Sequence, residues 1–199
     1  MLRWLRHTSE LQRTGQQIYE RIVAQARSEG LYLQHGVADS MEGRFEMILL
    51  HLVLVRERLK HEGAAGQRLG QDLLERLISD MDDALRQIGI GDMGVPRRVK
   101  RAAAAFGERA QAYVPALAPL PPADRRRDAP DDRLETALLT HVYQCRDAGE
   151  TAAHIAHVDA LAAYVRRAAA ALSAMPSAEL LAGTLDFGTL GGTAPDPRP

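Results

Sequence analysis

The chain has 199 residues, enough for one helical domain with a core of its own, and 46% of them are hydrophobic. Its formal net charge of −1 excludes a global field that would draw it to nucleic acid or anionic lipid. The single cysteine, Cys145, excludes an internal disulfide and fits a reducing compartment. The longest apolar run, 47–55, is much shorter than the roughly 20 residues of a membrane-spanning helix. We therefore expect a cytoplasmic protein.

Alanine, leucine, arginine and glutamate dominate the sequence, and these residues favour helix over sheet. They predict an all-α fold, a bundle of about six helices with irregular N- and C-terminal extensions. Apolar residues at helical spacing predict a first helix over 9–29, within an N-terminal segment of residues 1–30. The next helix is expected over 40–61, with Ser40 as its N-cap. Its part at 47–55 is apolar on every side, which predicts a central helix buried on all faces.

The middle of the chain carries two more helical patterns. A short linker at 62–66 precedes a stripe of apolar residues that predicts a helix over 67–88. A further helix begins at Pro96, where the missing N–H costs nothing, and its apolar face extends to Tyr113. We expect residues 31–114 to form the core of the domain.

The C-terminal part of the chain begins with a segment rich in proline. Residues 115–130 hold five prolines and three consecutive arginines, which predicts an extended linker. Helices are then expected over 131–147 and 151–175, followed by a short one, and we expect all of 131–185 to pack on the core. The glycine- and proline-rich segment 186–199 predicts a disordered tail.

Two clusters of charge oppose the dipoles of their helices. The acidic cluster, near the end of the helix over 67–88, comprises Asp80, Asp82 and Asp83. The basic cluster, at the start of the next helix, comprises Arg97, Arg98, Lys100 and Arg101. Because these signs are unfavourable at those helix ends, helix stability does not explain them. Two interpretations stay open: the clusters neutralise each other across the intervening turn, or they form a polar recognition rim for a partner.

A second polar set lies on the helix expected over 40–61. It comprises Glu42, Arg44, Glu46 and His51. Two acids and a histidine suggest a carboxylate-bridged metal site, but that site needs Glu-x-x-His on paired helices, and the sequence has no such motif. We favour His51 as a core histidine bonded to a buried neighbour, with Arg44 and Glu46 fixing helix ends.

A third set gives the main alternative function. His141, Cys145, His154 and His157 lie at helical spacing on two adjacent predicted helices, which could bring them together around zinc. The alternative is thus a helical metal-binding protein or enzyme. The spacing matches no zinc pattern with a fixed short loop, and a partly buried polar seam between two helices is favoured. We predict no catalytic residue, no metal and no cofactor.

Short motifs occur along the chain in the same order as in one protein family. They are Leu31-Tyr32, Gly36-Val37, Glu42-Gly43-Arg44-Phe45-Glu46-Met47, Leu50-His51, Asp80-Met81-Asp82-Asp83-Ala84-Leu85-Arg86, Gly89-Ile90-Gly91-Asp92, Val95-Pro96-Arg97, Ala105-Phe106 and Tyr113. Through these motifs the segment from Leu31 to Tyr113 resembles the ubiquinol–cytochrome c chaperone family. The N-terminal helix and the residues after Tyr113 carry no motif of this resemblance.

The resemblance implies an all-helical assembly chaperone without catalysis. Its client would be newly made cytochrome b, or another subunit, before ubiquinol–cytochrome c reductase (complex III) is built. Mitochondrial relatives act with a small partner protein and near the ribosome, which makes both of these candidate partners. An N-terminal contact through Leu2, Trp4 and Leu5 would be peripheral, on the cytoplasmic face of the inner membrane. No specific nucleic-acid partner is expected, although a helical nucleic-acid-binding module using 97–101 is a further alternative.

A chaperone for a membrane subunit needs apolar surface that can cover a client helix. We expect the helices over 40–61, 67–88 and 96–113 to leave a groove lined by Leu, Met and Phe, because methionine adapts to clients of several shapes. The residues expected to bind a partner at this groove and its charged rim are Glu42, Arg44, Phe45, Met47, His51, Asp80, Asp82, Asp83, Arg86, Asp92, Arg97, Lys100 and Arg101.

Overall fold

The computed structural model of the chain describes residues 2–87, 95–119 and 131–191. Within these ranges all regular structure is helical, which confirms the predicted all-α class. Six of the helices have nine residues or more, in agreement with the expected bundle of about six. The elements are α1 Leu2–Ala26, α2 Glu29–Leu33, α3 Met41–Leu59, the 3₁₀ turn η1 Lys60–Glu62, α4 Gly63–Gln87, α5 Val95–Leu117, α6 Arg133–His141, α7 Ala148–Ala174 and α8 Ser177–Leu181.

The long helix α3 is the centre of the fold, as its sequence predicts. Every residue from Leu49 to Val55 is buried, and α1, α4, α5 and α7 all pack against the helix. The Ser40 hydroxyl caps its N-terminus by accepting a hydrogen bond from the Gly43 N–H at 3.1 Å. A Cβ at Gly43 would come within 2.0 Å of the Ala38 carbonyl oxygen. The first turn of α3 therefore requires a glycine where the incoming loop crosses it.

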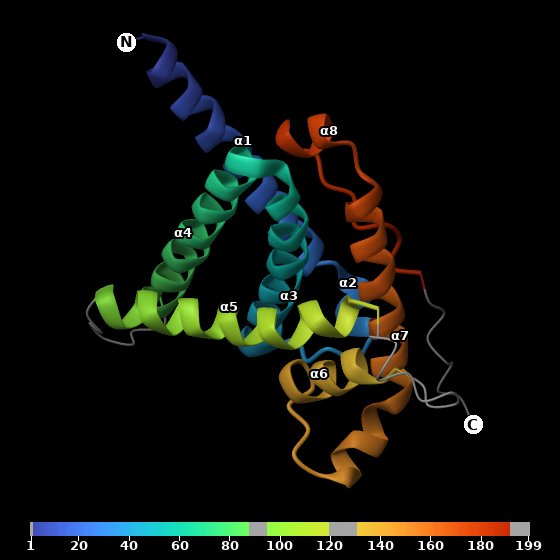
Figure 1. Cartoon of the computed structure of the whole chain (residues 1–199). Helices are drawn as coiled ribbons and strands as arrows, with labels where there is room; N and C mark the ends of the chain where they lie inside the picture. The colour runs from blue at the N-terminus through green and yellow to red at the C-terminus, as the bar shows by residue number, and fades with distance from the viewer. Residues whose placement is uncertain (1, 88–94, 120–130, 192–199) are drawn as a thin grey trace.

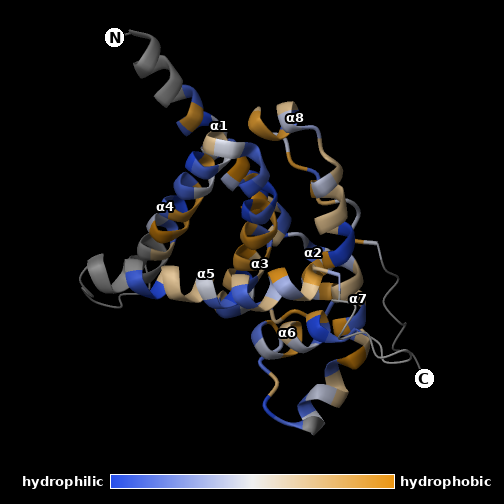
Figure 2. Ribbon diagram, viewed as in Figure 1, coloured by the Kyte–Doolittle hydropathy of each residue, from blue (hydrophilic) through white to orange (hydrophobic). Residues whose placement is uncertain are grey.

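Three consecutive helices form the sides of a triangle (Figure 1). Helix α3 leads through η1 directly into α4, and α5 then packs against both α3 and α4. The segment 62–66 is therefore not the linker that we expected. Gly63 allows the reversal, because its φ of 57° is one that residues with a side chain rarely adopt. Figure 2 shows apolar residues along most of α3 and a more polar outer surface on α4.

Helix α1 packs along α3 and α4, and α7 packs on α3. The first helix ends at Ala26 instead of 29, and the chain then makes the separate short helix α2. The helix expected over 131–147 is also shorter, ending at His141. Leu134 and Leu138 of α6 belong to the same buried cluster as the middle of α3.

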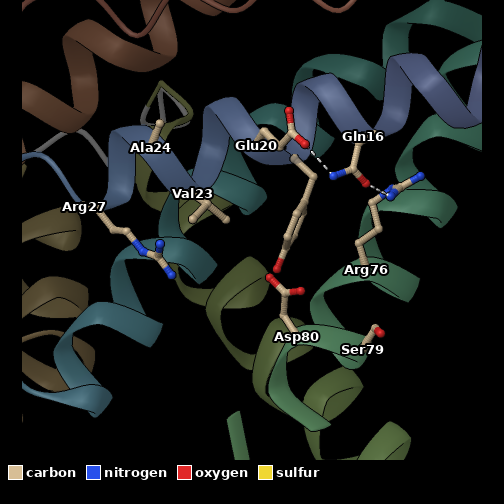
Figure 3. Close-up of a pocket in the computed structure, with 9 residues that line it drawn as sticks. Gln16, Glu20, Val23, Ala24, Arg27, Arg76, Ser79 and Asp80 are labelled. Atoms are coloured by element: carbon tan, nitrogen blue, oxygen red, sulfur yellow. Dashed lines mark hydrogen bonds between the residues drawn. The ribbon is translucent and has the colours of Figure 1, made fainter. Parts of the chain in front are cut away.

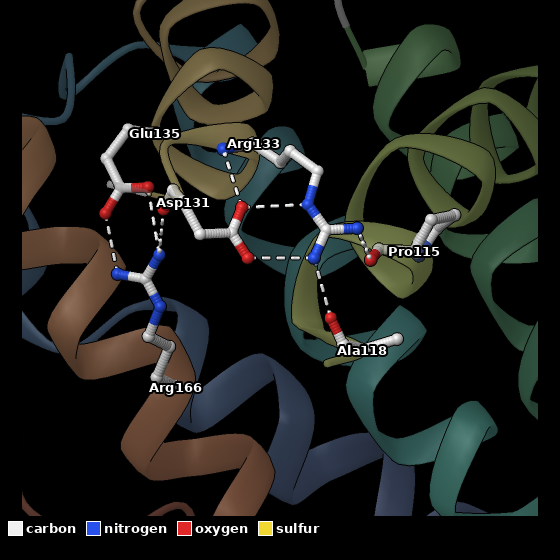
Figure 4. Close-up of polar contacts among 6 residues, drawn as sticks. All are labelled: Pro115, Ala118, Asp131, Arg133, Glu135 and Arg166. Atoms are coloured by element: carbon white, nitrogen blue, oxygen red, sulfur yellow. Dashed lines mark hydrogen bonds and ion pairs between the residues drawn. The ribbon is translucent and has the colours of Figure 1, made fainter. Parts of the chain in front are cut away.

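Charged side chains fix α6 between α5 and α7 (Figure 4). The Arg133 guanidinium donates to the carbonyl oxygens of Pro115 and Ala118, each at 2.7 Å, and to both carboxylate oxygens of Asp131 at 2.8 Å. The hydrogen bonds from Arg133 lower the pKa of Asp131 to about 2. Arg166 of α7 donates to the Glu135 carboxylate at 2.6 and 2.9 Å. The residues that flank the proline-rich segment are thus held in place, and 120–130 lie outside the described residues.

The expected disorder of 186–199 does not apply to its first six residues. Leu185 and Phe187 are buried, and the Phe187 ring meets His51 edge-on at 5.0 Å between ring centroids. Arg167 of α7 donates to the carbonyl oxygens of Leu190 and Gly191 at 3.2 and 2.9 Å. The glycine-rich composition hides this order, because two or three well-placed apolar side chains suffice to anchor an extended segment. Residues 192–199 lie outside the described part of the chain.

Candidate partner-binding surface

The expected partner-binding residues on α3 lie in two different environments. Met47 and His51 are completely buried, so neither side chain reaches a surface that a partner could touch. Arg44 is exposed and pairs with Asp39 at 2.6 Å, and Glu42 is also exposed. Phe45 is half-buried against the core. Local sequence could not separate these cases, because burial is set by helices that are distant in the chain.

The histidine His51 belongs to a hydrogen-bonded chain in the core, as we expected for it. Its Nδ1 lies 2.7 Å from the Met47 carbonyl oxygen, and its Nε2 lies 2.7 Å from the Tyr164 hydroxyl. A carbonyl oxygen only accepts, so Nδ1 carries the proton and Nε2 accepts from Tyr164, which in turn accepts from Gln25 Nε2 at 2.9 Å. Burial lowers the pKa of His51 to about 4, which keeps the imidazole neutral at pH 7.

Glu46 connects two helices instead of fixing a helix end. Its carboxylate accepts two hydrogen bonds from the Arg109 guanidinium of α5, one of them from Nε at 3.0 Å. The bond to this carboxylate raises the pKa of Arg109. The pair crosses from α3 to α5 near the buried Tyr113 and stabilises the corner where these helices meet.

Asp80, near the end of α4, faces α1. A cleft of about 510 Å³ between these two helices is lined by Tyr19, Arg27, Arg76 and Asp80, among others (Figure 3). Arg76 spans the cleft by donating to Asp72 at 2.7 Å and to the Gln12 carbonyl oxygen at 2.9 Å. Burial and then the charge of Asp80 raise the pKa of the Tyr19 hydroxyl, which places Asp80 beside it. Asp80 is therefore beside α1, whereas we had expected it on the rim of a groove formed by the helices over 40–61, 67–88 and 96–113.

A second cleft continues from the first. It has about 460 Å³, is lined by Arg27, Glu29, Tyr32, Leu33, Asp39 and Arg44, and shares Arg27 with the first. We call the two together the α1 furrow. Leu33 is 76% exposed there and offers a large apolar side chain to a partner. The furrow thus combines Arg44 and Asp80, two expected partner-binding residues, with accessible apolar surface.

A smaller apolar pocket was not foreseen from the sequence. It has about 150 Å³, enough for one benzene-sized apolar group, and lies between α3, α5 and α7. Its lining residues are Val53, Leu54, Glu57, Arg58, His61, Val114, Leu117, Ala169, Leu172 and Ser173. Arg58 fixes one wall by donating to the carbonyl oxygens of Leu172 and Met175, both at 3.0 Å. Because its lining residues come from three helices that are far apart in the sequence, no local motif predicts this pocket.

The three helices of the triangle carry apolar side chains that are only partly buried. They are Phe45 and Ile48 on α3, Leu74 on α4, and Ala105 and Phe106 on α5. Lys100 and Arg101 are exposed near the start of α5. Asp92 and the side chains of Asp82, Asp83, Arg86 and Arg97 lie outside the described residues, so both interpretations of the charged clusters stay predictions for them.

The alternative metal site is not assembled. His141 lies edge-on to Tyr113 at 5.9 Å, whereas His154 lies at 4.8 Å from Tyr143 and 6.3 Å from His157, all between ring centroids. Across residues 2–87, 95–119 and 131–191, no group of three or more potential metal ligands is close enough to hold an ion. The three histidines are partly buried, and their described contacts are with aromatic rings and with each other. In the same ranges, no helix is long and apolar enough to cross a membrane.

The comparisons with known proteins agree with this helical fold. Residues 33–187 match the family model described as ubiquinol–cytochrome c chaperone. The crystal structure of the Cbp3 homolog from Brucella abortus superimposes with a TM-score of 0.76 and 31% sequence identity, covering 95% of this chain and 97% of that one. No protein with a curated description matches the chain.

These matches define the class of protein, which is an all-helical chaperone of complex III assembly. The chain belongs to the ubiquinol–cytochrome c chaperone family, whose model covers well over half of its residues. The family match continues far beyond Tyr113, where the motifs of the resemblance end. It therefore includes α6, α7 and the packed segment through Phe187.

Proposed function

We propose that this chain binds newly made cytochrome b and holds it until complex III is assembled. The observation that supports this most is the family match over 33–187, joined to a structural likeness that covers 95% of the chain. A cytochrome b chaperone needs surfaces that bind apolar helices, but it must not expose a large continuous apolar surface of its own.

The described surface offers two regions of this kind. The triangle of α3, α4 and α5 presents half-buried apolar side chains from all three helices, among them Phe45, Leu74 and Phe106. The α1 furrow adds the exposed Leu33 beside the Arg44–Asp39 ion pair. Apolar contact would provide the affinity for a client helix, and the flanking charges would guide its approach and orientation.

The cationic start of α5 is a rim of the triangle that can be tested separately. Lys100 and Arg101 are exposed there, and Arg97 lies one turn earlier in the same helix. Charge reversal at Arg97 and Arg101 should weaken client binding and leave helicity unchanged, because cations in the first turns of a helix do not stabilise it. Reversal of the exposed Arg13 on α1 is a matched control that should have no effect.

The experiment is capture of cytochrome b from cells that make it, with the tagged full-length chain as bait. We expect wild type to retain cytochrome b specifically, and the doubly reversed variant to retain several-fold less at an unchanged circular dichroism spectrum. Capture of other membrane subunits instead of cytochrome b would contradict the proposal. Equal capture by the reversed variant would remove only the cationic rim from it.

A further inference from the structure

The side chain of Arg56 reaches both of the other helices of the triangle. It belongs to α3, and its guanidinium carbon is 4.8 Å from the centre of the Phe106 ring on α5. Its Nε lies so close to Gly70 of α4 that an added Cβ there would approach it to 3.2 Å. One turn before Arg56 on α3 is the apolar Leu52, and one turn after Gly70 on α4 is the apolar Leu74. The partly buried guanidinium therefore lies between α3, α4 and α5, beside the Phe106 ring and Gly70.

This guanidinium has no anionic partner among the described residues. No carboxylate lies within ion-pair distance of it, and its neighbour Glu57 is paired with Lys60. Because the guanidinium is partly buried, its charge has lost part of its hydration, and this burial lowers the pKa of Arg56. The Phe106 ring compensates for only part of that loss. An arginine with five N–H donors and no acceptor is thus left facing the interior of the triangle.

The lack of a carboxylate partner distinguishes Arg56 from the other partly buried arginines of the described residues. All other half-buried arginines among the described side chains have a carboxylate partner, and these pairs are Arg58–Glu62, Arg76–Asp72, Arg109–Glu46 and Arg133–Asp131. The chain therefore neutralises a partly desolvated arginine wherever the fold alone requires one. Arg56 departs from that rule at the apolar surface on which the proposed function relies.

We propose that Arg56, supported by the Phe106 ring, is the docking point for an aspartate or glutamate side chain of the client polypeptide that enters the triangle. The partner chemistry follows from charge complementarity, because a guanidinium in apolar surroundings favours a bidentate carboxylate. The client segment would carry this acid next to apolar residues that cover Leu74 and Phe106. This inference rests on the proposed function and names the recognition chemistry at one of its surfaces.

The first test compares capture of cytochrome b by three full-length variants. We expect R56Q to lower apparent affinity by at least about tenfold, because it removes one member of a largely desolvated ion pair. R56K keeps the charge and should retain most of the binding, whereas R68Q, at an exposed arginine of α4, should bind like wild type. If R56Q captures as much cytochrome b as wild type, the docking point is wrong and the proposed function stands. If wild type captures none, the proposed function itself fails.

The second test identifies the group that reaches Arg56. A carbodiimide joins a carboxylate to an amine with loss of the elements of water, so the amine introduced by R56K can be linked to an acid in contact with it. We expect mass spectrometry of the captured complex to find this amide on an aspartate or glutamate of the client. Adducts only within the chain, for example to Glu57, or only between two copies of the chain, would overturn the inference. Melting temperatures of R56K and R56Q near that of wild type would show that binding, not folding, is measured.

Discussion

The two sides of α3 differ in how their polar groups are satisfied. On the side that faces α7, His51 bonds to Tyr164 and Met47, and Gln25 of α1 completes the chain of hydrogen bonds. Phe187 covers this network from the C-terminal segment. On the side that faces α4 and α5, Glu46 pairs with Arg109, but Arg56 has no carboxylate partner among the described residues and lies against the Phe106 ring. Several apolar side chains of these helices are only partly buried.

This difference between the two sides of α3 indicates how one helix can contribute both to stability and to recognition. Buried polar groups that are fully bonded make one side rigid and insensitive to partners. Groups left incompletely satisfied at a half-covered surface gain energy only when another molecule supplies the missing contacts. We call the side of α3 that faces α7 the closed side, and the side that faces α4 and α5 the open side. We therefore expect changes on the closed side to alter stability, and changes on the open side to alter binding.

The largest effect should come from removing the cover of the closed side. Phe187→Ala takes a ring that is only 5% exposed out of the core and leaves a cavity beside His51. We expect a loss of about 3 kcal/mol in the free energy of unfolding, measured by urea denaturation. Leu33→Ala, at a side chain that is 76% exposed, is the control and should change stability by less than about 0.5 kcal/mol. A Phe187→Ala variant as stable as wild type would mean that the tail does not seal this side.

Acid should destabilise the closed side next. Burial lowers the pKa of His51 to about 4 and also lowers the pKa of His35, so the unfolded chain binds more protons than the folded one as pH falls below the ordinary histidine value near 6.5. The free energy of unfolding should therefore decrease from pH 6.5 toward pH 4, by up to about 1.4 kcal/mol per pH unit for His51, and His35 adds a decrease of the same sign. Urea denaturation at pH 7, 6 and 5 measures this slope. A stability independent of pH over that range would exclude a neutral buried His51.

Removal of one hydroxyl should have a smaller effect. Tyr164→Phe leaves His51 Nε2 and Gln25 without their shared partner, and we expect a loss of about 1–2 kcal/mol in the free energy of unfolding. Tyr113→Phe is the matched control, because the buried Tyr113 hydroxyl has no hydrogen-bond partner in the described part of the chain. Its removal should be neutral or slightly stabilising. Equal losses in the two variants would show that the hydrogen-bonded chain is not what stabilises this side.

The smallest change in stability is expected on the open side. Phe106→Leu keeps an apolar side chain in the triangle but removes the ring beneath Arg56, and it should cost less than about 1 kcal/mol. Capture of cytochrome b should nevertheless fall several-fold, since the guanidinium loses its support. Ile48→Val, a half-buried position on α3, is the control for the loss of apolar surface alone. If the Phe106 variant is clearly less stable than wild type but captures as much cytochrome b, the open side serves stability and not binding, which would contradict our assignment.

Much of the architecture follows from local sequence. The apolar run at 47–55 predicts the buried middle of α3, and Ser40 predicts the cap that begins it. Helical spacing predicts the regions of α4 and α5, although Gly63 starts α4 earlier than the expected linker allows. These features depend on residues within a few positions of each other, which is why a single sequence reveals them.

The candidate surfaces were harder to predict. Arg44 and Asp80 were expected at a partner surface and do line the α1 furrow, whereas Met47 and His51 are inside the core. Arg56 was not singled out at all, because its significance is a missing partner, and a missing partner becomes visible only when the surrounding helices are in place.

The sequence by itself determined the helical class, the central helix and the family. Only the tertiary structure decided which polar groups meet. His51 bonds to Tyr164, which is 113 residues away in the sequence, and Glu46 bonds to Arg109, which is 63 residues away. Helix periodicity and capping act over a few residues, while these pairs depend on the angles at which whole helices cross. Those angles are set by packing of many side chains at once, which no local pattern encodes.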